Sequence, residues 1–301
     1  MKIAAGIVVY NPQIDRLEDC INQLRGQVEC IILYDNSTED NGISSAFDNV
    51  IYMTSHKNIG IASALNKIFL KGKELGYDWI ITMDQDTIVP TNLVSEFTKH
   101  LNINDVAIVC PQVVDKRRVY LETDKVESEL SEVDFCITSA SCTNLKIWDS
   151  VGRFDDYLFI DFVDNDFCKR LRLANKKILR CNKVVIDQEF GDIKLKATVW
   201  VNFYLMLSKL LHNRNIAKLT YRKKVSPFRV YYVHRNLLYL NKKFKKYGGI
   251  GYENFYCHTF LGFLLYFSLP SFVRGQNKFK ILKAILQGLY DGYKSQAIII
   301  N

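Results

Sequence analysis

The sequence predicts an α/β fold, in which a mostly parallel, doubly wound sheet is flanked by helices and followed by a helical C-terminal extension. Strand-like apolar runs alternate with helical patterns over the first part of the chain, and each of these runs ends in polar residues. Such alternation is typical of βαβ units, whose strands are buried on both faces. The chain has 301 residues, of which 48% are hydrophobic, so it can bury a large core.

Four strands are predicted from short apolar runs in the first part of the chain. They are expected within residues 3–10, 30–35, 50–54 and 79–84. After Gly60, apolar residues recur at helical spacing, so one helix face is expected to carry Ile61, Leu65, Ile68 and Phe69. The carboxyl ends of parallel strands meet at one edge of a sheet. We therefore expect the polar clusters that follow these strands to converge.

The pattern becomes mixed further along the chain. We expect a strand-like run over 133–141, a short helix near 144–150, a helix that begins near Val163, and strands at 177–181 and 184–188. Beyond Gly191 the pattern is mainly helical. We accordingly predict one domain over residues 1–192 and a helical region over residues 193–301.

Charge is distributed unevenly between these two parts. Residues 193–301 contain 19 basic and two acidic residues, whereas the preceding residues contain 21 basic and 30 acidic ones. The net charge of +17 on residues 193–301 suggests that this part of the chain contacts an anionic membrane or nucleic acid. A solvated basic face is the alternative. The aromatic residues lie in long apolar helical runs rather than on an exposed stacking sheet. We therefore expect peripheral membrane contact and no nucleic-acid partner.

Residues 255–273 form an apolar run of 19 residues, close to the roughly 20 that a spanning helix needs. Polar residues interrupt the run and basic residues flank both ends, against the positive-inside tendency. We expect this segment to lie in the membrane interface or to pack on the protein. The N-terminus is typical of a buried strand rather than a signal peptide, which predicts a cytosolic chain. Its eight cysteines form no CxxC pair and are expected to be reduced and mostly buried.

Asp84, Gln85 and Asp86 follow the fourth predicted strand directly. Two carboxylates on such a turn suit a hard cation, Mg²⁺ or Mn²⁺, whose remaining ligands would be substrate phosphates and water. That cation would neutralise a departing diphosphate. Acidic turns of this pattern are common, so the prediction depends on its position after three other polar strand ends.

Six motifs follow one another in the order VVYNP, YDNST, NIGIASALN, DQD, TSASCTN and FIDFVDNDFCKRLR. In this order and spacing the sequence resembles family 2 inverting glycosyltransferases of the GT-A fold. The later segment SPFRVYYVHRNLLYL resembles the rhamnosyltransferase branch that builds bacterial surface polysaccharides. The resemblance covers about residues 3–245. It implies that residues 1–192 bind a nucleotide sugar and catalyse transfer. The basic charge of residues 193–301, rather than the resemblance, predicts that they associate with a membrane.

The resemblance implies a nucleotide-sugar pocket made of residues at the strand ends. These are Tyr10, Asn11, Asp35, Asn36, Asn58, Gly60, Asn66, Asp84, Gln85 and Asp86. Asp35 is expected against the pyrimidine base. Residues 35–37 also fit an ordinary Asx turn or a helix cap, and Gly60 also fits a simple turn.

The resemblance also implies that Asp164 is the general base that takes the proton of the acceptor hydroxyl. It lies near a helix start, where exposed N–H groups favour an ionised carboxylate. The acceptor is expected to contact Asp161, Ser139, Ala140 and Ser141. Asp166 is placed to pair with Arg170. Helix capping by the aspartates and plain strand polarity of the serines stay open as alternatives.

One position departs from the pattern of the family. Relatives usually carry a histidine three residues before the glycine of a Gly-Asp pair, where it helps to bind metal or diphosphate. This chain has Gln188 there, before Gly191 and Asp192. Glutamine is a poorer ligand than imidazole for a transition metal. The metal site is therefore expected to consist of Asp86 and Asp84 with a weak contribution from Gln188.

The leading interpretation is a metal-dependent hexosyltransferase that moves rhamnose from dTDP-rhamnose to a lipid-linked glycan during bacterial surface polysaccharide and cell wall synthesis. It would act at the cytoplasmic face of the membrane. Galactofuranose, glucose or N-acetylglucosamine, from a dTDP- or UDP-sugar, are the alternatives. A nucleotidyltransferase is disfavoured because no glycine-rich phosphate loop with a lysine lies near the N-terminus. A non-catalytic basic binding protein and a homodimer are left open.

Overall fold

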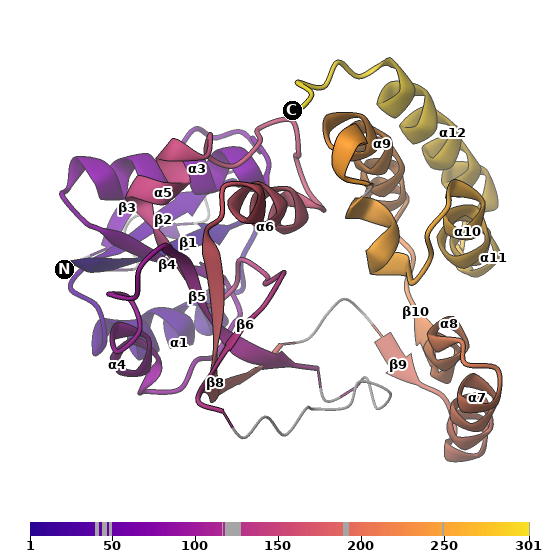
Figure 1. The fold of residues 1–301 in the computed structure, drawn as a ribbon, viewed down its shortest axis with the longest axis horizontal. Helices are drawn as coiled ribbons and strands as arrows, with labels where there is room; N and C mark the ends of the chain where they lie inside the picture. The colour runs from indigo at the N-terminus through magenta and orange to yellow at the C-terminus, as the bar shows by residue number, and fades with distance from the viewer. Residues whose placement is uncertain are drawn as a thin grey trace. The chain divides into compact units, whose positions relative to one another are not determined.

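The structure, a computed structural model, describes residues 1–39, 42, 43, 47, 50–115, 117, 128–188, 193–248 and 250–300. The chain divides into two compact units (Figure 1). Unit one contains Met1–Val114 and Lys125–Gln188, and unit two contains Asp115–Asp124 and Glu189–Asn301. Gly191 and Asp192, which follow Gln188 in the sequence motif, lie outside the described residues.

The described part of unit one is built on an eight-stranded sheet with the order β3-β2-β1-β4-β7-β5-β8-β6. The strands are β1 (Ile3–Val9), β2 (Ile31–Asp35), β3 (Val50–Thr54), β4 (Trp79–Asp84), β5 (Val106–Val114), β6 (Leu130–Glu132), β7 (Ser141–Asn144) and β8 (Lys177–Asp187). Pairs β1–β2, β1–β4, β2–β3 and β5–β8 are parallel, and the pairs made by β6 and β7 are antiparallel. The predicted mostly parallel sheet is confirmed.

Helices cover both faces of this sheet, which explains why β2 is buried along its whole length (Figure 1). On one face lie α1 (Ile14–Arg25) and α4 (Leu93–Thr98), whose buried Leu17, Ile21 and Phe97 belong to the main hydrophobic cluster. On the other lie α3 (Ile61–Glu74), α5 (Leu145–Ser150) and α6 (Val163–Leu173). Their apolar side chains fill the second layer of the core.

Most predicted elements lie where the periodicity placed them, and α3 buries Leu65, Ile68 and Phe69 as expected, with Ile61 half-buried. The strand-like run predicted over 133–141 is wrong, because extended structure begins only at Ser141. Ala140 has a left-handed φ of 56°, and the Ser141 amide donates to the carbonyl of Thr138 (3.1 Å), so the chain turns before β7. The two strands predicted at 177–181 and 184–188 form the single strand β8.

Unit two is mainly helical, as expected. It contains a two-stranded antiparallel sheet of β9 (Ile193–Leu195) and β10 (Tyr221–Lys223). Its helices are α7 (Thr198–Leu210), α8 (Arg214–Ala217), η1 (Lys218–Thr220), α9 (Pro227–Lys243), η2 (Lys245–Tyr247), η3 (Ile250–Phe255), α10 (Phe260–Phe263), the π-helix η4 (Leu264–Ser268), α11 (Leu269–Arg274) and α12 (Lys278–Lys294). Within the described chain, no helix combines the length and the apolar character needed to cross a membrane.

All eight cysteines are free thiols and six of them are buried, which confirms their predicted state. His234 in α9 is fully buried against the rings of Phe263 and Phe267. Burial lowers its pKa to about 4, so this imidazole is neutral. Its two ring nitrogens lie 2.7 Å from the Val230 carbonyl and the Ser268 hydroxyl, which gives it a structural role.

Candidate active site

The carboxyl end of β2 forms a compact polar turn at the edge of the sheet. One oxygen of the buried Asp35 carboxylate accepts the backbone N–H of Ser37 (2.8 Å), and the other accepts the Tyr52 hydroxyl (3.0 Å). The first contact makes residues 35–37 an Asx turn, as one of the alternatives predicted. The Ser37 hydroxyl in turn accepts the N–H of Asn11 (2.8 Å), so the ends of β1 and β2 are tied together.

Asn36 connects this turn to the loop before α3. Its side-chain amide donates to the carbonyl of Gly60 (3.2 Å) and accepts the N–H of Ile59 (3.1 Å). Asn58 caps the same loop by accepting the N–H of Gly60 (3.0 Å). Asn36 and Asn58 therefore set the path of the backbone along this edge of the sheet.

Gly60 lies at the start of α3 with a φ of 84°. A Cβ atom there would lie 2.7 Å from the carbonyl oxygen of Phe159, and the neighbouring amide of Ile61 donates to that same oxygen (2.7 Å). Both the left-handed φ and the close backbone require glycine. Glycine at this position thus lets the start of α3 approach the loop that precedes α6, and contact of Gly60 with a nucleotide sugar stays a prediction.

The turn after β4 carries the predicted DxD carboxylates at the same edge. Asp84 and Asp86 are both exposed, and the side chain of Gln85 accepts the N–H of the exposed Tyr10 (2.8 Å). The pKa of Asp84 is raised, first by burial of part of its carboxylate and second by the charge of the nearby Asp86. Hydrogen bonds from Gln188 and Ser139 to this carboxylate lower the pKa and so oppose the rise. The two aspartates repel each other, so a cation between them would be favourable.

Gln188, at the end of β8, reaches this turn from a strand that is distant in the sequence. Its side-chain nitrogen donates to one carboxylate oxygen of Asp84, while its buried side-chain oxygen has no hydrogen-bond partner among the described residues. An orphaned oxygen beside two carboxylates fits a hard divalent cation such as Mg²⁺ or Mn²⁺. No group of three or more Asp, Glu, His or Cys side chains in the described chain could hold a metal.

The residues predicted to contact the acceptor, Ser139, Ala140 and Ser141, are all buried behind the DxD turn. The Ser139 hydroxyl lies 3.0 Å from that of Thr87 and accepts the N–H of Asp84 (3.4 Å), so it supports the turn. The Ser141 hydroxyl donates to the carbonyl of Ile137 (2.6 Å). These hydrogen bonds stabilise the turn from within the protein. Contact of these three residues with an acceptor stays a prediction.

The start of α6 carries the second group of carboxylates. Asp161 and Phe162 have left-handed φ values of 64° and 67°, which cost about 1–3 kcal/mol each for non-glycine residues. This backbone places Asp164 in the first turn of α6, half-buried and facing a cavity of about 10 Å³, room for one water molecule. Strain of this kind is concentrated at functional sites.

Asp164 differs from the expectation that the helix N-terminus keeps its carboxylate ionised. Burial, followed by the charge of Asp84, raises the pKa of Asp164 to about 7, although hydrogen bonds from the backbone and side chain of Thr138 oppose the rise. Desolvation and repulsion therefore outweigh the helix dipole, whose effect is typically below one pKa unit. The effect of the Asp84 charge on this pKa indicates that the two carboxylates lie near each other, and a carboxyl group with this pKa changes its protonation state near neutral pH.

Thr138 begins the TSASCTN motif but was not among the predicted site residues. It contacts Asp164, and its carbonyl accepts both the Thr82 hydroxyl of β4 and the N–H of Ser141. It therefore links the strand that carries the DxD turn to Asp164. Only the fold brings these segments together, so no local pattern could have revealed the contact.

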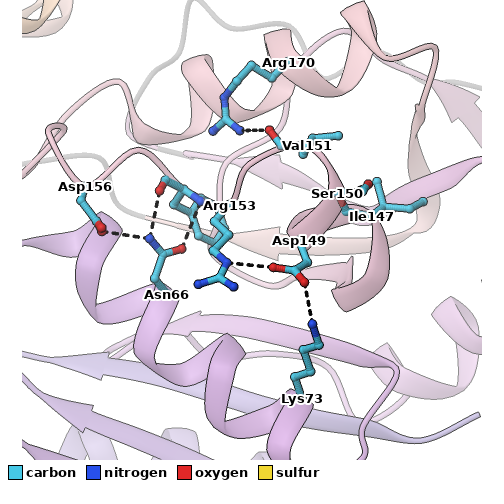
Figure 2. A network of polar contacts seen from close by, with 10 residues as sticks. Asn66, Lys73, Ile147, Asp149, Ser150, Val151, Arg153, Asp156 and Arg170 are labelled. Atoms are coloured by element: carbon cyan, nitrogen blue, oxygen red, sulfur yellow. Dashed lines mark hydrogen bonds and ion pairs between the residues drawn. The ribbon is translucent and has the colours of Figure 1, made fainter. Parts of the chain in front are cut away.

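Asp166 faces away from the carboxylates and forms a buried ion pair with Arg170, as predicted. One Asp166 oxygen accepts from two guanidinium nitrogens at 2.9 and 2.7 Å, and a third nitrogen of Arg170 donates to the Val151 carbonyl (2.6 Å). Figure 2 shows this last contact from α6 to the end of α5. The pair anchors the helix that carries Asp164.

Asn66 in α3, predicted to bind the nucleotide sugar, bonds within the protein. Its amide oxygen accepts the N–H of Phe154 (3.0 Å), and its nitrogen donates to the Phe154 carbonyl and the Asp156 carboxylate, both at 2.9 Å (Figure 2). Nearby, Asp149 joins Lys73 of α3 to Arg153. This network fixes the loop before α6, so the structure gives Asn66 a supporting role.

Comparison with known proteins places the chain among glycosyltransferases. The family profile of Glycosyl transferase family 2 matches residues 5–181. The dTDP-rhamnosyl transferase RfbF of Shigella flexneri is 26% identical over 193 residues, which cover 59% of this chain and 64% of that protein. The matched part is thus less than two thirds of that relative.

Solved structures with the GT-A fold resemble this one. GalNAc-T7, solved with UDP, GalNAc and Mn²⁺, aligns with a TM-score of 0.54 at 11% identity, over 89% of this chain and 56% of that one. TarS 1-349 of S. aureus, solved alone and with UDP, aligns with a TM-score of 0.51 at 11% identity, over 97% of this chain and 89% of that one. At this identity the likeness concerns the fold alone.

Proposed function

Because the chain belongs to glycosyl transferase family 2, we propose that it transfers rhamnose from dTDP-rhamnose, with inversion, to a lipid-linked glycan of a bacterial surface polysaccharide. The observation that carries this proposal is that the Asp84 carboxylate of the DxD turn lies near enough to Asp164 to raise its pKa. The choice of rhamnose is supported by the similarity to a dTDP-rhamnosyl transferase.

In the proposed reaction, Asp164 accepts the proton of the acceptor hydroxyl as the hydroxyl oxygen attacks the anomeric carbon. The new carbon–oxygen bond forms on the side opposite the diphosphate. The bond between the anomeric carbon and the diphosphate oxygen breaks, and the nucleoside diphosphate leaves with its electron pair. A single displacement inverts the anomeric configuration. A carboxylate with a pKa of about 7 suits this role because it is ionised near neutral pH and strongly basic for a carboxylate.

The remaining site residues position the donor and acceptor in this proposal. Tyr10, Asn11 and the turn at Asp35 line the nucleotide side, and Asp161 lies on the acceptor side. Asp84, Asp86 and Gln188 would hold Mg²⁺ or Mn²⁺, which when bound stabilises the charge of the leaving diphosphate. The orphaned oxygen of Gln188, directly after β8, would offer such a cation a lone pair.

We also propose that the chain works at the cytoplasmic face of the membrane, where a lipid-linked acceptor would be presented. Residues 193–301 carry a net charge of +17, which favours anionic headgroups. In this interpretation residues 1–192 form the catalytic domain and residues 193–301 form the membrane-associating one.

The donor can be identified by a thermal-shift screen of nucleotide sugars with Mg²⁺ or Mn²⁺. A true donor at about 100 times its Kd stabilises the native state by roughly 2.7 kcal/mol. We expect dTDP-rhamnose to give the largest shift, and a larger shift with a UDP-sugar would replace rhamnose by that sugar. Release of diphosphate from a nucleoside triphosphate would instead favour a nucleotidyltransferase.

The base is tested by Asp164→Asn, an isosteric change that removes the basic oxygen. Transfer should fall by about 10³-fold or more, while donor affinity stays near that of the wild type. Asp105→Asn serves as the control of equal charge change, because the exposed Asp105 pairs with Lys176 and is not a predicted site residue, and it should transfer at the wild-type rate. Transfer near the wild-type rate in Asp164→Asn would assign the base elsewhere.

A further inference from the structure

Two helical segments near the C-terminus of unit two have one apolar face turned outward. The first is the continuous helical run 260–274, made of α10, η4 and α11, and the second is α12. Residues 275–277 join them, and α11 packs beside α12. We call these two segments the C-terminal helical pair.

The inner faces of this pair are committed to the rest of unit two. Phe263 is fully buried against His234, and Ile281 of α12 packs with Val230 of α9. A Cβ atom on Gly288 would lie 2.5 Å from the Tyr231 carbonyl oxygen, so α12 and α9 approach closely. This packing fixes the rotation of both segments and leaves their opposite faces uncovered by the described residues.

The outer faces carry two rows of large apolar side chains. In the first segment, residues four positions apart are between 51% and 66% exposed: Leu261, Leu265, Leu269 and Val273. In α12 the corresponding row is between 43% and 77% exposed: Phe279, Leu282, Leu286, Tyr290 and Tyr293. Single exposed apolar residues are ordinary, but adjacent rows of this length mark an interaction surface.

The charges around these rows indicate the partner. Residues 260–294 contain five basic residues and one acidic residue. The acidic one, Asp291, accepts the hydroxyl of Tyr231 in α9 (2.7 Å) and so faces inward. The ammonium of Lys294 lies 4.4 Å from the Tyr290 ring, which places a cation at the border of the apolar row. A second copy would bring an equally positive surface, whereas anionic lipid complements it.

We propose that the outer face of the C-terminal helical pair lies in the interface of an anionic bilayer, with its leucine and aromatic rows among the acyl chains and its lysines at the headgroups. This inference rests on the proposed function in that it names the surface that brings the site to a lipid-linked acceptor. An amphipathic pair with basic edges has the composition of helices that lie in the membrane plane.

The test is co-sedimentation of the full chain with vesicles of phosphatidylcholine alone or mixed equally with phosphatidylglycerol. We expect binding to the anionic vesicles that weakens with salt, because each lysine near the surface contributes roughly fivefold in affinity. The variant Leu265→Glu/Leu286→Glu should bind at least about tenfold more weakly. The matched control Leu75→Glu/Ile103→Glu adds the same charge at exposed apolar positions of unit one and should bind like the wild type.

Two further measurements keep the result decisive. Circular dichroism shows whether the variant is folded, and Lys280→Glu/Lys283→Glu, which spares the apolar rows, should also weaken binding to anionic vesicles. The proposal is overturned if the leucine variant binds like the wild type, if Leu210→Glu on α7 abolishes binding instead, or if sedimentation shows that the leucine variant dissociates a dimer.

Failure of this inference can be told apart from failure of the proposed function. Transfer to a water-soluble acceptor fragment needs no bilayer, so the leucine variant should keep the wild-type rate with that acceptor. Vesicle binding without transfer by the wild type would overturn the proposed function alone. Transfer without vesicle binding would overturn this inference alone.

Discussion

At the scale of single residues, Asp164 shows how environment decides the chemistry of a carboxyl group. The first turn of a helix favours an anion, but here burial and the charge of Asp84 dominate. The pKa of about 7 means that the group loses its proton only as the solution becomes neutral. The same side chain would be a much weaker base if it were solvated.

The raised pKa predicts an acid limb in the rate of transfer. Because the active form is the carboxylate, kcat/KM should fall about tenfold per pH unit below roughly pH 7 and level off above it. Saturating Mg²⁺ should move this limb to lower pH, since a cation at Asp84 relieves the repulsion. Initial rates across the neutral range measure this, and a limb centred near the ordinary aspartate pKa contradicts the assignment.

The raised pKa of Asp164 also affects the folding stability, so the shift can be tested independently of the transfer rate. A carboxyl group whose pKa is raised by folding stabilises the protein only while it is protonated. Between about pH 4 and 7 the wild type should therefore lose about 3 kcal/mol of stability relative to Asp164→Asn, because each unit of pKa shift corresponds to roughly 1.4 kcal/mol. Urea unfolding of both proteins at the two ends of this range measures the difference.

Gln188 predicts how metal affinity can be changed. Replacing it by histidine should lower the Mn²⁺ concentration needed for donor binding, by about tenfold, because imidazole is the better ligand for a transition metal. Gln188→Leu is the matched control, since leucine neither coordinates nor donates to Asp84, and it should raise that concentration. Calorimetric titration of the donor at several Mn²⁺ concentrations measures this dependence in the wild type and both variants. Equal metal dependence in all three proteins would show that Gln188 does not contribute to the metal site.

At the scale of elements, α6 is held by contacts that reach beyond its own sequence. Arg170 connects it to the end of α5 through Val151, and Asn66 of α3 fixes the loop that leads into it. Gly60 lets the start of α3 approach that loop at Phe159. Asp164 is therefore positioned by three segments that lie far apart in the chain.

The buried pair of Asp166 and Arg170 gives a prediction for this element. Asp166→Ala leaves the guanidinium buried without its carboxylate and should lower the free energy of unfolding by about 3–5 kcal/mol. Adding Arg170→Met removes the stranded charge and should recover part of the loss. Urea unfolding followed by tryptophan fluorescence compares the proteins, and equal losses in the single and double variants would mean that the pair itself matters little.

At the scale of the whole molecule, the contacts divide into two units, while every predicted site residue belongs to unit one. A donor nucleotide should therefore stabilise unit one directly. Calorimetry of the full chain should show an unfolding transition that rises with donor concentration and another that does not. A single transition that moves as a whole would show that the units unfold together.

Local patterns were enough to predict β1 to β4, the polar residues at their carboxyl ends, α6 and the basic helical region, because periodicity and charge belong to neighbouring residues. The strands β5 and β6 were not predicted, and residues 133–141 were misassigned because a left-handed turn overrides their β-forming composition.

Other properties depend on residues that only the tertiary structure brings together. The chain by itself specified Asp84-Gln85-Asp86 and Asp164 as candidates, but their charge coupling, the pKa of Asp164 and the orphaned oxygen of Gln188 arise from packing across distant strands. The same holds for Asn66, whose amide is engaged by the loop at Phe154, and for the outward rows of the C-terminal helical pair. Burial and electrostatic interactions depend on distance in space, and the fold alone sets that distance.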